Sequence, residues 1–166
     1  MRVRSPGWWR ASLTISVAFG CPFEGPVDEG RVVEWVRRAA EVGFDEIVLA
    51  DTIGIADPRQ VGRLVRRSRE ATEGRVPIGV HLHNTRNTGL ANAYAALENG
   101  ATTFDASVGG LGGCPFAPNA TGNIATEDLV YIRRTLTERV FSRRRTPAGR
   151  QPAAHVRRCG VDIIGR

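Results

Sequence analysis

The sequence contains no lysine, because all 23 of its basic residues are arginine. This absence excludes any mechanism that needs a lysine Schiff base. An enzyme of this chain that acted on carbon–carbon bonds would therefore have to use a metal ion. Cysteine is also scarce: Cys21, Cys114 and Cys159 are odd in number and far apart. This pattern argues against a secreted disulfide framework and favours a reducing compartment.

Long apolar runs are missing as well. No stretch of the sequence approaches the length of a transmembrane helix. The moderately apolar run at 11–19 follows several arginines, but serine and threonine interrupt it and no small-residue cleavage site comes after it. It is therefore a poor signal peptide. We expect a soluble, cytoplasmic protein with no membrane partner.

Positive charge is present but is confined to one end of the chain. The formal net charge is +6, yet the stretch from Arg133 onward contains ten arginines and two acidic residues, so the preceding part carries −2. This basic stretch lacks interleaved aromatic residues, so we expect a solvated, disordered tail at 141–166 rather than a nucleic-acid contact. The hydrophobic content of 42% over 166 residues suits one folded domain.

Strand and helix patterns alternate four times along the chain. Asp57 can cap one of the helices, with Pro58 in its first turn and Gln60 completing a capping box. Four βα units in series predict a parallel sheet with right-handed connections. The expected strands lie at 13–19, 46–50, 76–80 and 102–108, and the expected helices at 28–42, from 58 onward, at 86–100 and around 129–132.

The sequence His81-Leu82-His83 stands where the third strand hands over to its helix. Side chains alternate along a strand, so the two imidazoles point the same way and lie a few ångströms apart. Such a pair at the carboxyl end of a strand is typical of a divalent metal site. The alternative is that two core or surface histidines are spaced by one residue by chance. Cys21, Asp51 and the glycine-rich loop at 109–123 should fall at the same edge.

Five segments resemble the second half of the 3-hydroxy-3-methylglutaryl-CoA lyase family, within a stretch from about Thr14 to Ile132. They are Phe-Gly-Cys-Pro-Phe-Glu-Gly at 19–25, Ala-Asp-Thr-Ile-Gly at 50–54, His-Leu-His-Asn-Thr at 81–85, Gly-Gly-Leu-Gly-Gly-Cys-Pro-Phe-Ala at 109–117 and Gly-Asn-Ile-Ala-Thr-Glu-Asp at 122–128. A wider family of metal-dependent lyases and Claisen-type synthases shares the His-x-His strand, whereas the Gly-Gly-Cys-Pro loop points to the lyases.

The resemblance implies an α/β fold of the (β/α)8 TIM-barrel type. About four βα units would be present here, as a half barrel equivalent to strands 5–8. On this basis we expect a non-matching leader at 1–10, a partial barrel domain at 11–140 and the arginine-rich tail at 141–166.

The resemblance also implies a metal site. His81 and His83 would be ligands, and Asn123 would be a third through its side-chain oxygen. This mixed set of nitrogen and oxygen ligands suits Mg²⁺ or Mn²⁺. In the family reaction the metal binds the carboxylate and tertiary hydroxyl of an acyl-CoA substrate. Loss of the hydroxyl proton then drives cleavage to acetoacetate and an acetyl-CoA enolate, which is protonated.

Catalytic and substrate-contacting roles follow from the same resemblance. Cys114, on a mobile glycine-rich loop, Asp51 and His81 would be catalytic, and the substrate would contact Asn84, Thr85, Gly112 and Gly113. Each role has a structural alternative. Asp51 could cap a strand end, Cys114 could be an inert buried thiol, Asn123 could be a turn residue, and the pair at 84–85 could only tie down its loop.

The family's amino-terminal half has no counterpart at 1–10, although its Arg-Asp-Gly segment supplies a catalytic arginine and a metal-binding aspartate. A half barrel would also leave open strand edges and an uncovered apolar side. We therefore expect a homo-oligomer or a partner that supplies the missing half. The alternatives are an inactive truncated fragment, an interaction module, or a related aldolase or acyl-CoA synthase.

Overall fold

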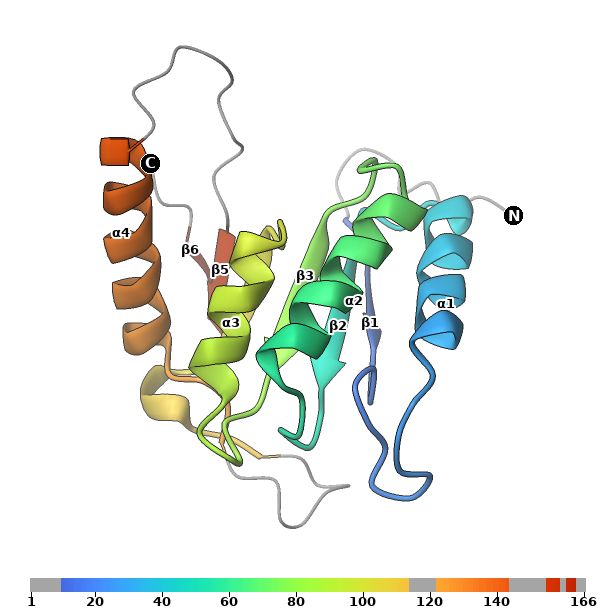
Figure 1. The fold of residues 1–166 in the computed structure, drawn as a ribbon, viewed down its shortest axis with the longest axis horizontal. Coiled ribbons are helices and arrows are strands. Elements are labelled where there is room, and N and C mark those ends of the chain that lie inside the picture. Colours follow the sequence, from blue (N-terminus) through green and yellow to red (C-terminus); the bar gives the residue numbers. More distant parts are fainter. Residues whose placement is uncertain (1–9, 114–121, 144–154, 159–160, 164–166) are drawn as a thin grey trace.

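The computed structural model describes residues 10–113, 122–143, 155–158 and 161–163, which form one twisted sheet with helices on one side (Figure 1). The sheet has six strands in the order β1-β2-β3-β4-β5-β6. The strands are β1 (Ser12–Ile15), β2 (Glu46–Asp51), β3 (Ile78–Leu82), β4 (Thr103–Ala106), β5 (His155–Arg158) and β6 (Val161–Ile163). The helices are α1 (Glu29–Val42), α2 (Pro58–Ala71), α3 (Gly89–Glu98), the 3-10 turn η1 (Val108–Gly110) and α4 (Thr126–Arg143).

Strands β1 to β4 pair in parallel and in chain order, each followed by a helix. This confirms the predicted series of four βα units and the fold of a partial (β/α)8 barrel. The segments that follow β1 to β4 lie at the lower edge of the sheet in Figure 1. Among the described helices, none combines the length and apolarity needed to cross a membrane.

Two strands lie where we expected a disordered tail. β5 pairs in parallel with β4, and β6 pairs antiparallel with β5. The prediction for 141–166 is therefore wrong at these two strands, and α4 also runs past 140 to Arg143. The physical reason is that the edge of β4 offers a row of N–H and C=O groups, which the backbone of another segment can satisfy. The leader expected at 1–10 lies outside the described residues except for Arg10.

The ends of the elements follow their capping residues. The Asp28 side chain accepts from Gly30 N at 2.9 Å to start α1, and Gly43 ends it in the left-handed region with φ 98°. Asp57 caps α2 as predicted. Half of the predicted capping box is present, because Gln60 N donates to Asp57 Oδ1 at 2.9 Å, but the Gln60 side chain reaches away from the cap and its Nε2 donates to the carbonyl of Phe19 at 3.1 Å. β1 is shorter than expected, since Val17 has a positive φ of 50°.

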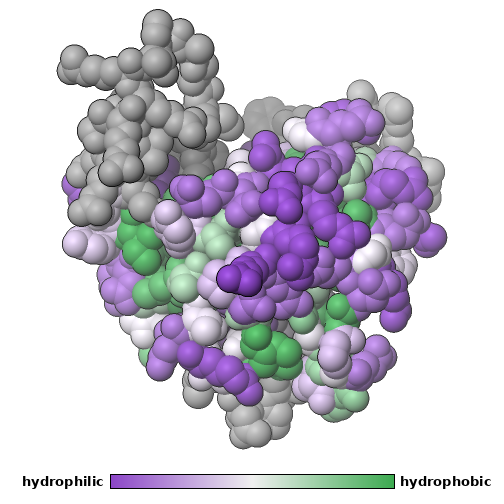
Figure 2. All heavy atoms as spheres, in the orientation of Figure 1, coloured by the Kyte–Doolittle hydropathy of each residue, from purple (hydrophilic) through white to green (hydrophobic). Residues whose placement is uncertain are grey.

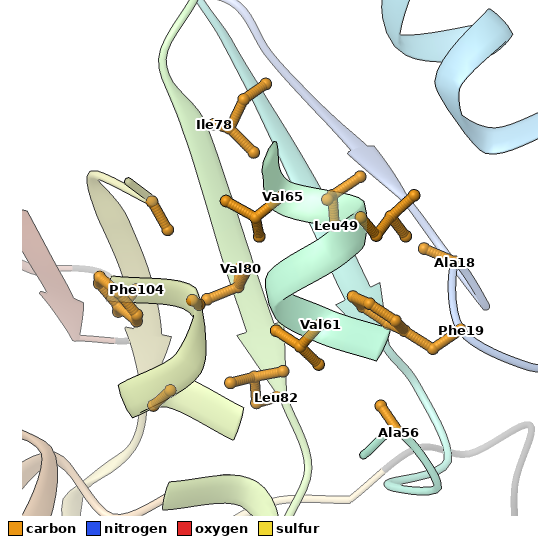
Figure 3. Packing of buried hydrophobic residues seen from close by; sticks show 14 of the residues in the cluster. Ala18, Phe19, Leu49, Ala56, Val61, Val65, Ile78, Val80, Leu82 and Phe104 are labelled. Carbon is orange, nitrogen blue, oxygen red and sulfur yellow. The ribbon is translucent and has the colours of Figure 1, made fainter. Parts of the chain in front are cut away.

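The hydrophobic core lies between the sheet and the helices. Alternate residues of β2 and β3 face the helix layer and pack against the apolar stripe of α2 (Figure 3). The main members of this core are Ile47, Leu49, Ile78, Val80, Leu82, Phe104, Val61 and Val65. Hydrophilic side chains predominate on the outer surface of the helices (Figure 2). This is the two-sided pattern expected of amphipathic helices on a sheet.

The second face of the sheet has a different composition. Residues paired in register share a face, so this face consists of Ser12, Thr14, Glu46, Val48, Ala50, Gly79, His81, Thr103 and Asp105. Most of these side chains are small or polar, which differs from the apolar side that we expected. Thr103 Oγ1 donates to the Glu46 carboxylate across β3. Gly79 lies between these strands, and a Cβ there would lie 3.2 Å from Thr103 Cβ.

Candidate functional site

The two histidines of the His-x-His sequence converge as predicted. His81 is in β3 and His83 follows the end of that strand. Their rings lie edge to face with centroids 5.1 Å apart. The His81 side chain is 30% exposed, whereas His83 is almost completely buried at 3%. The pair therefore presents two imidazoles at one point, at the carboxyl edge of the sheet.

Asn123 is brought to this point by a short segment that pairs with the end of β3. Asn84 N donates to Gly122 O at 2.9 Å, and Ile124 N donates to Leu82 O at 3.2 Å. These two bonds flank an antiparallel bridge between His83 and Asn123. Further backbone bonds join the same segment to Ser107 at the end of β4. Asn123 is thus held opposite His83 by backbone geometry.

The side chain of Asn123 has one bonded end and one unbonded end. Its Nδ2 donates to Leu111 O at 3.1 Å. Its Oδ1 is inaccessible to solvent and has no hydrogen-bond partner in the described structure. A buried polar atom without a partner is costly, so this oxygen is available to accept from a ligand or water or to bind an ion.

Two imidazoles and one amide oxygen are a donor set that fits Mg²⁺ or Mn²⁺. The fit is partial. Within the described ranges no three His, Cys, Asp or Glu side chains come together as metal ligands. A carboxylate ligand for this site would have to come from outside these residues.

Asp105 is a site residue that the sequence did not reveal. Its Oδ2 lies 3.6 Å from His81 Nδ1, and both side chains are about one-third exposed. A carboxylate beside one ring nitrogen of a metal-binding histidine fixes the orientation of the ring and leaves the other nitrogen for the metal. The two residues are paired in register on neighbouring strands. Register is a tertiary property, so the residue pattern alone gave no signal for this contact.

Asp51 ends β2 and is buried, with 1% of its surface exposed. Its two carboxylate oxygens accept from Ile55 N and Ala56 N, each at 3.1 Å. Burial raises the pKa of Asp51, while the backbone N–H groups and nearby His83 act in the opposite direction. These contacts match the strand-end capping alternative. A role for Asp51 at the reacting centre stays a prediction.

Asn84 and Thr85 lie in the loop between β3 and α3. Asn84 Oδ1 accepts from Gly89 N at 3.0 Å and so holds the start of α3. Thr85 packs against the backbone of Gly54, where a Cβ would lie 2.6 Å from Thr85 Oγ1. These contacts tie the loop to its neighbour, as the structural alternative required. Contact of Asn84 and Thr85 with a substrate stays a prediction.

The glycine-rich segment begins after β4. Gly112 and Gly113 are exposed, and Gly109 N donates to the Glu127 carboxylate of α4 at 3.0 and 3.1 Å. The residue pattern gave no signal for this contact between the glycine-rich segment and α4. Cys114, the predicted catalytic thiol, lies outside the described residues.

Sequential parallel βα units with two histidines and an asparagine at their carboxyl edge define a partial barrel with a polar cluster at that edge. The family described as HMGL-like matches residues 10–144. Because this match covers most of the chain, the chain belongs to the HMGL-like family.

Named relatives are acyl-CoA lyases. The (R)-citramalyl-CoA lyase of Chloroflexus aurantiacus is 52% identical over 120 residues, which are 72% of this chain and 38% of the relative. The hydroxymethylglutaryl-CoA lyase YngG of Bacillus subtilis is 46% identical over 130 residues, or 74% of this chain and 42% of the relative. A solved hydroxymethylglutaryl-CoA lyase of Acinetobacter baumannii, in complex with coenzyme A and 3-methylmalate, is 47% identical with a TM-score of 0.70 over 76% of this chain and 41% of that one.

The chain therefore spans about two fifths of the length of the curated relatives that it matches.

Proposed function

We propose that this chain supplies the carboxyl-terminal part of the active site of a metal-dependent carbon–carbon lyase. Its reaction would be the cleavage of 3-hydroxy-3-methylglutaryl-CoA to acetyl-CoA and acetoacetate. The observation that carries the proposal is the buried Oδ1 of Asn123, which has no hydrogen-bond partner among the described residues. Asn123 is bridged to His83, at the edge where the His81 and His83 rings meet.

His81, His83 and Asn123 are the residues that would hold Mg²⁺ or Mn²⁺ in this proposal. When bound, the ion would act as a Lewis acid toward the hydroxyl and carboxylate oxygens of the substrate. The chain's own contribution is to fix the three ligands. Asp105 orients the His81 ring, and the backbone bonds of the 122–124 segment set the position of Asn123.

The reaction needs one group to take the proton of the tertiary hydroxyl and another to return a proton to the enolate carbon of acetyl-CoA. The electron pair of the broken carbon–carbon bond passes to that enolate. The titratable side chains that we propose for these two transfers are Asp51 and Cys114, while His81 would contribute to catalysis as a ligand of the ion. We further propose that Asn84, Thr85, Gly112 and Gly113 contact the acyl-CoA.

A complementary polypeptide segment would complete the site. The second face of the sheet is polar, and the described ligands number fewer than a closed metal site requires. We propose that the partner is either the remaining barrel units or a second copy of this chain. A cytoplasmic location also remains a prediction.

A citramalyl-CoA is the second candidate substrate, because the 52% identical relative is named a citramalyl-CoA lyase. Both substrates are tertiary-alcohol acyl-CoA esters, and the same bond cleavage would release pyruvate in place of acetoacetate. A related aldolase or acyl-CoA synthase reaction is a weaker candidate, since no named relative favours it.

The first test is calorimetric titration of the purified chain with Mn²⁺, compared with a His81→Ala, His83→Ala variant. Thr14→Ala is the matched control, because Thr14 is exposed on β1 and distant in sequence from the ligands. Circular dichroism of each variant reports whether it folds. We expect binding that persists in the control and is lost in the double variant.

The second test is release of acetoacetate or pyruvate from the two acyl-CoA substrates. The chain is assayed alone and with a polypeptide that covers the remaining barrel units of a relative. Turnover that needs His81 and His83 supports the proposal, and the product identifies the substrate. If the folded wild type binds Mn²⁺ no better than the double variant and releases neither product with the added segment, the chain is a non-catalytic fragment or an interaction module.

A further inference from the structure

We propose that the Asn123 carboxamide couples occupation of the metal site to the position of the Leu111 backbone. Asn123 would then be a positioning residue for the glycine-rich segment at 109–113, in addition to a ligand. This inference rests on the proposed function, because it requires a ligand on Asn123 Oδ1.

The first argument is the chemistry of the carboxamide. Its oxygen is buried and unbonded, and its nitrogen donates to Leu111 O at 3.1 Å. The amide group is planar, so a cation that fixes the oxygen also fixes the direction of the two N–H bonds. Withdrawal of electrons from the oxygen makes those N–H groups stronger donors. The bond to Leu111 should therefore tighten when the oxygen is bound.

The second argument is that hydrogen bonds to the backbone of Leu111, and not packing of its side chain, hold this residue in place. Its side chain is 74% exposed, so little core contact fixes it. Its carbonyl oxygen accepts from two side chains, Asn123 Nδ2 and Ser107 Oγ. Of these two donors, Asn123 also carries a buried oxygen, Oδ1, that has no hydrogen-bond partner among the described residues. This oxygen lies at the edge of the sheet where the two histidines meet. A change at the metal site can therefore reach Leu111 through a single side chain.

The third argument is that the two segments are in direct backbone contact. A Cβ at Gly112 would lie 2.8 Å from Asn123 Nδ2, and a Cβ at Gly110 would lie 2.9 Å from Asn123 O. Gly122 allows no side chain either, because its Cβ would meet Gly110 O. Glycine at these positions removes any side chain that could absorb a movement of Asn123. A shift of the carboxamide is thus transmitted to residues 110–112.

The test is hydrogen–deuterium exchange of the peptide that spans residues 108–113, with and without saturating Mn²⁺. In the wild type we expect Mn²⁺ to slow exchange by about five-fold, the effect of strengthening one hydrogen bond by a typical net amount. The informative variant is Asn123→Asp. It keeps an oxygen for the metal but loses the N–H donor to Leu111, so metal binding should persist while the slowing disappears.

Ser107→Ala is the matched control, because it removes the other donor to the same carbonyl. We expect faster exchange of 108–113 in this variant but the same relative slowing by Mn²⁺. The inference is overturned if Mn²⁺ binds the wild type and leaves 108–113 unchanged, or if Asn123→Asp binds Mn²⁺ and shows the full slowing. Both results would leave the metal site intact. If calorimetry shows no Mn²⁺ binding to the folded wild type, the metal site itself is wrong and the coupling falls with it.

Discussion

The two faces of the sheet differ in composition, one apolar and the other largely small or polar. The face toward the helices is lined by large aliphatic residues that are fully buried, such as Leu49, Val80 and Leu82. On the second face the corresponding strands carry Ala50, His81 and Asp105. The first set comes from β2 and β3 and the second from β2, β3 and β4, at alternate positions along the strands.

Because successive side chains of a strand point to opposite faces, the residues that form the core and the residues of the candidate site alternate along the same strands. Burial of apolar surface against the helices supplies most of the favourable free energy. The second face holds Asp105, which is one-third exposed, and the buried Glu46, which accepts a hydrogen bond from Thr103. Single substitutions on each face therefore test whether stability and metal binding depend on different faces of the sheet.

The largest effect is expected on the helix-facing side. Leu49→Ala should lower the free energy of unfolding by about 3 kcal/mol, because it leaves a cavity among fully buried neighbours. Urea denaturation followed by circular dichroism measures this value. Thr14→Ala, at an exposed position of the second face, should change it by less than about 0.5 kcal/mol. Equal losses in the two variants would contradict the division between the faces.

A smaller loss is expected from a buried polar contact on the second face. Thr103→Val removes the hydroxyl that donates to Glu46 and should destabilise the chain by about 1.5 kcal/mol. The control is Thr102→Val, because the Thr102 hydroxyl makes only a long contact of 3.5 Å with Ile78 O. Thermal and urea unfolding compare the two. A Thr103→Val chain as stable as wild type would show that the second face adds no stability through this contact.

Asp105→Asn should affect metal binding far more than stability. Loss of the carboxylate beside His81 Nδ1 should weaken Mn²⁺ binding about ten-fold in calorimetry. Its unfolding free energy should stay within about 0.5 kcal/mol of the wild type, since the side chain is one-third exposed. Asp128→Asn, an exposed acid in the first turn of α4, is the control and should bind Mn²⁺ as the wild type does.

The smallest effect concerns charge within the helix layer. Glu29 of α1 binds Arg63 and Arg67 of α2 at 2.6 and 3.0 Å, and hydrogen bonds from these arginines lower its pKa below 4.5. The stabilisation is therefore complete above the unfolded pKa and is lost as the pH falls through the folded pKa. Glu29→Gln should cost less than about 1 kcal/mol at pH 7.

This difference from the wild type should vanish in strong acid, and unfolding curves across pH 2–7 measure it. Glu24→Gln, at an exposed position of the loop after β1, is the control and should show no such pH-dependent difference. A difference that stays constant down to the lowest pH would mean that the ion pairs do not cause it.

Much of the fold could be predicted because its signals are local. Asp28, Gly43 and Asp57 mark helix ends through their own backbone and side-chain chemistry. The backbone half of the predicted capping box at Gln60 is confirmed, but its side chain contacts Phe19 O, a carbonyl distant in sequence that a local pattern cannot reveal. The strands within 141–166 were missed for the same reason, since their partner is the edge of β4.

The sequence by itself determined that His81 and His83 share a face, because side-chain direction in a strand depends only on spacing. It also determined, through its motifs, the HMGL-like family. Only the tertiary structure decided that Asp105 lies beside His81 and that Asp51 accepts hydrogen bonds from the loop after its own strand. It also decided that the Asn123 side chain donates to the carbonyl oxygen of Leu111. Those relations depend on register and on chain segments meeting in space, which no local pattern of residues encodes.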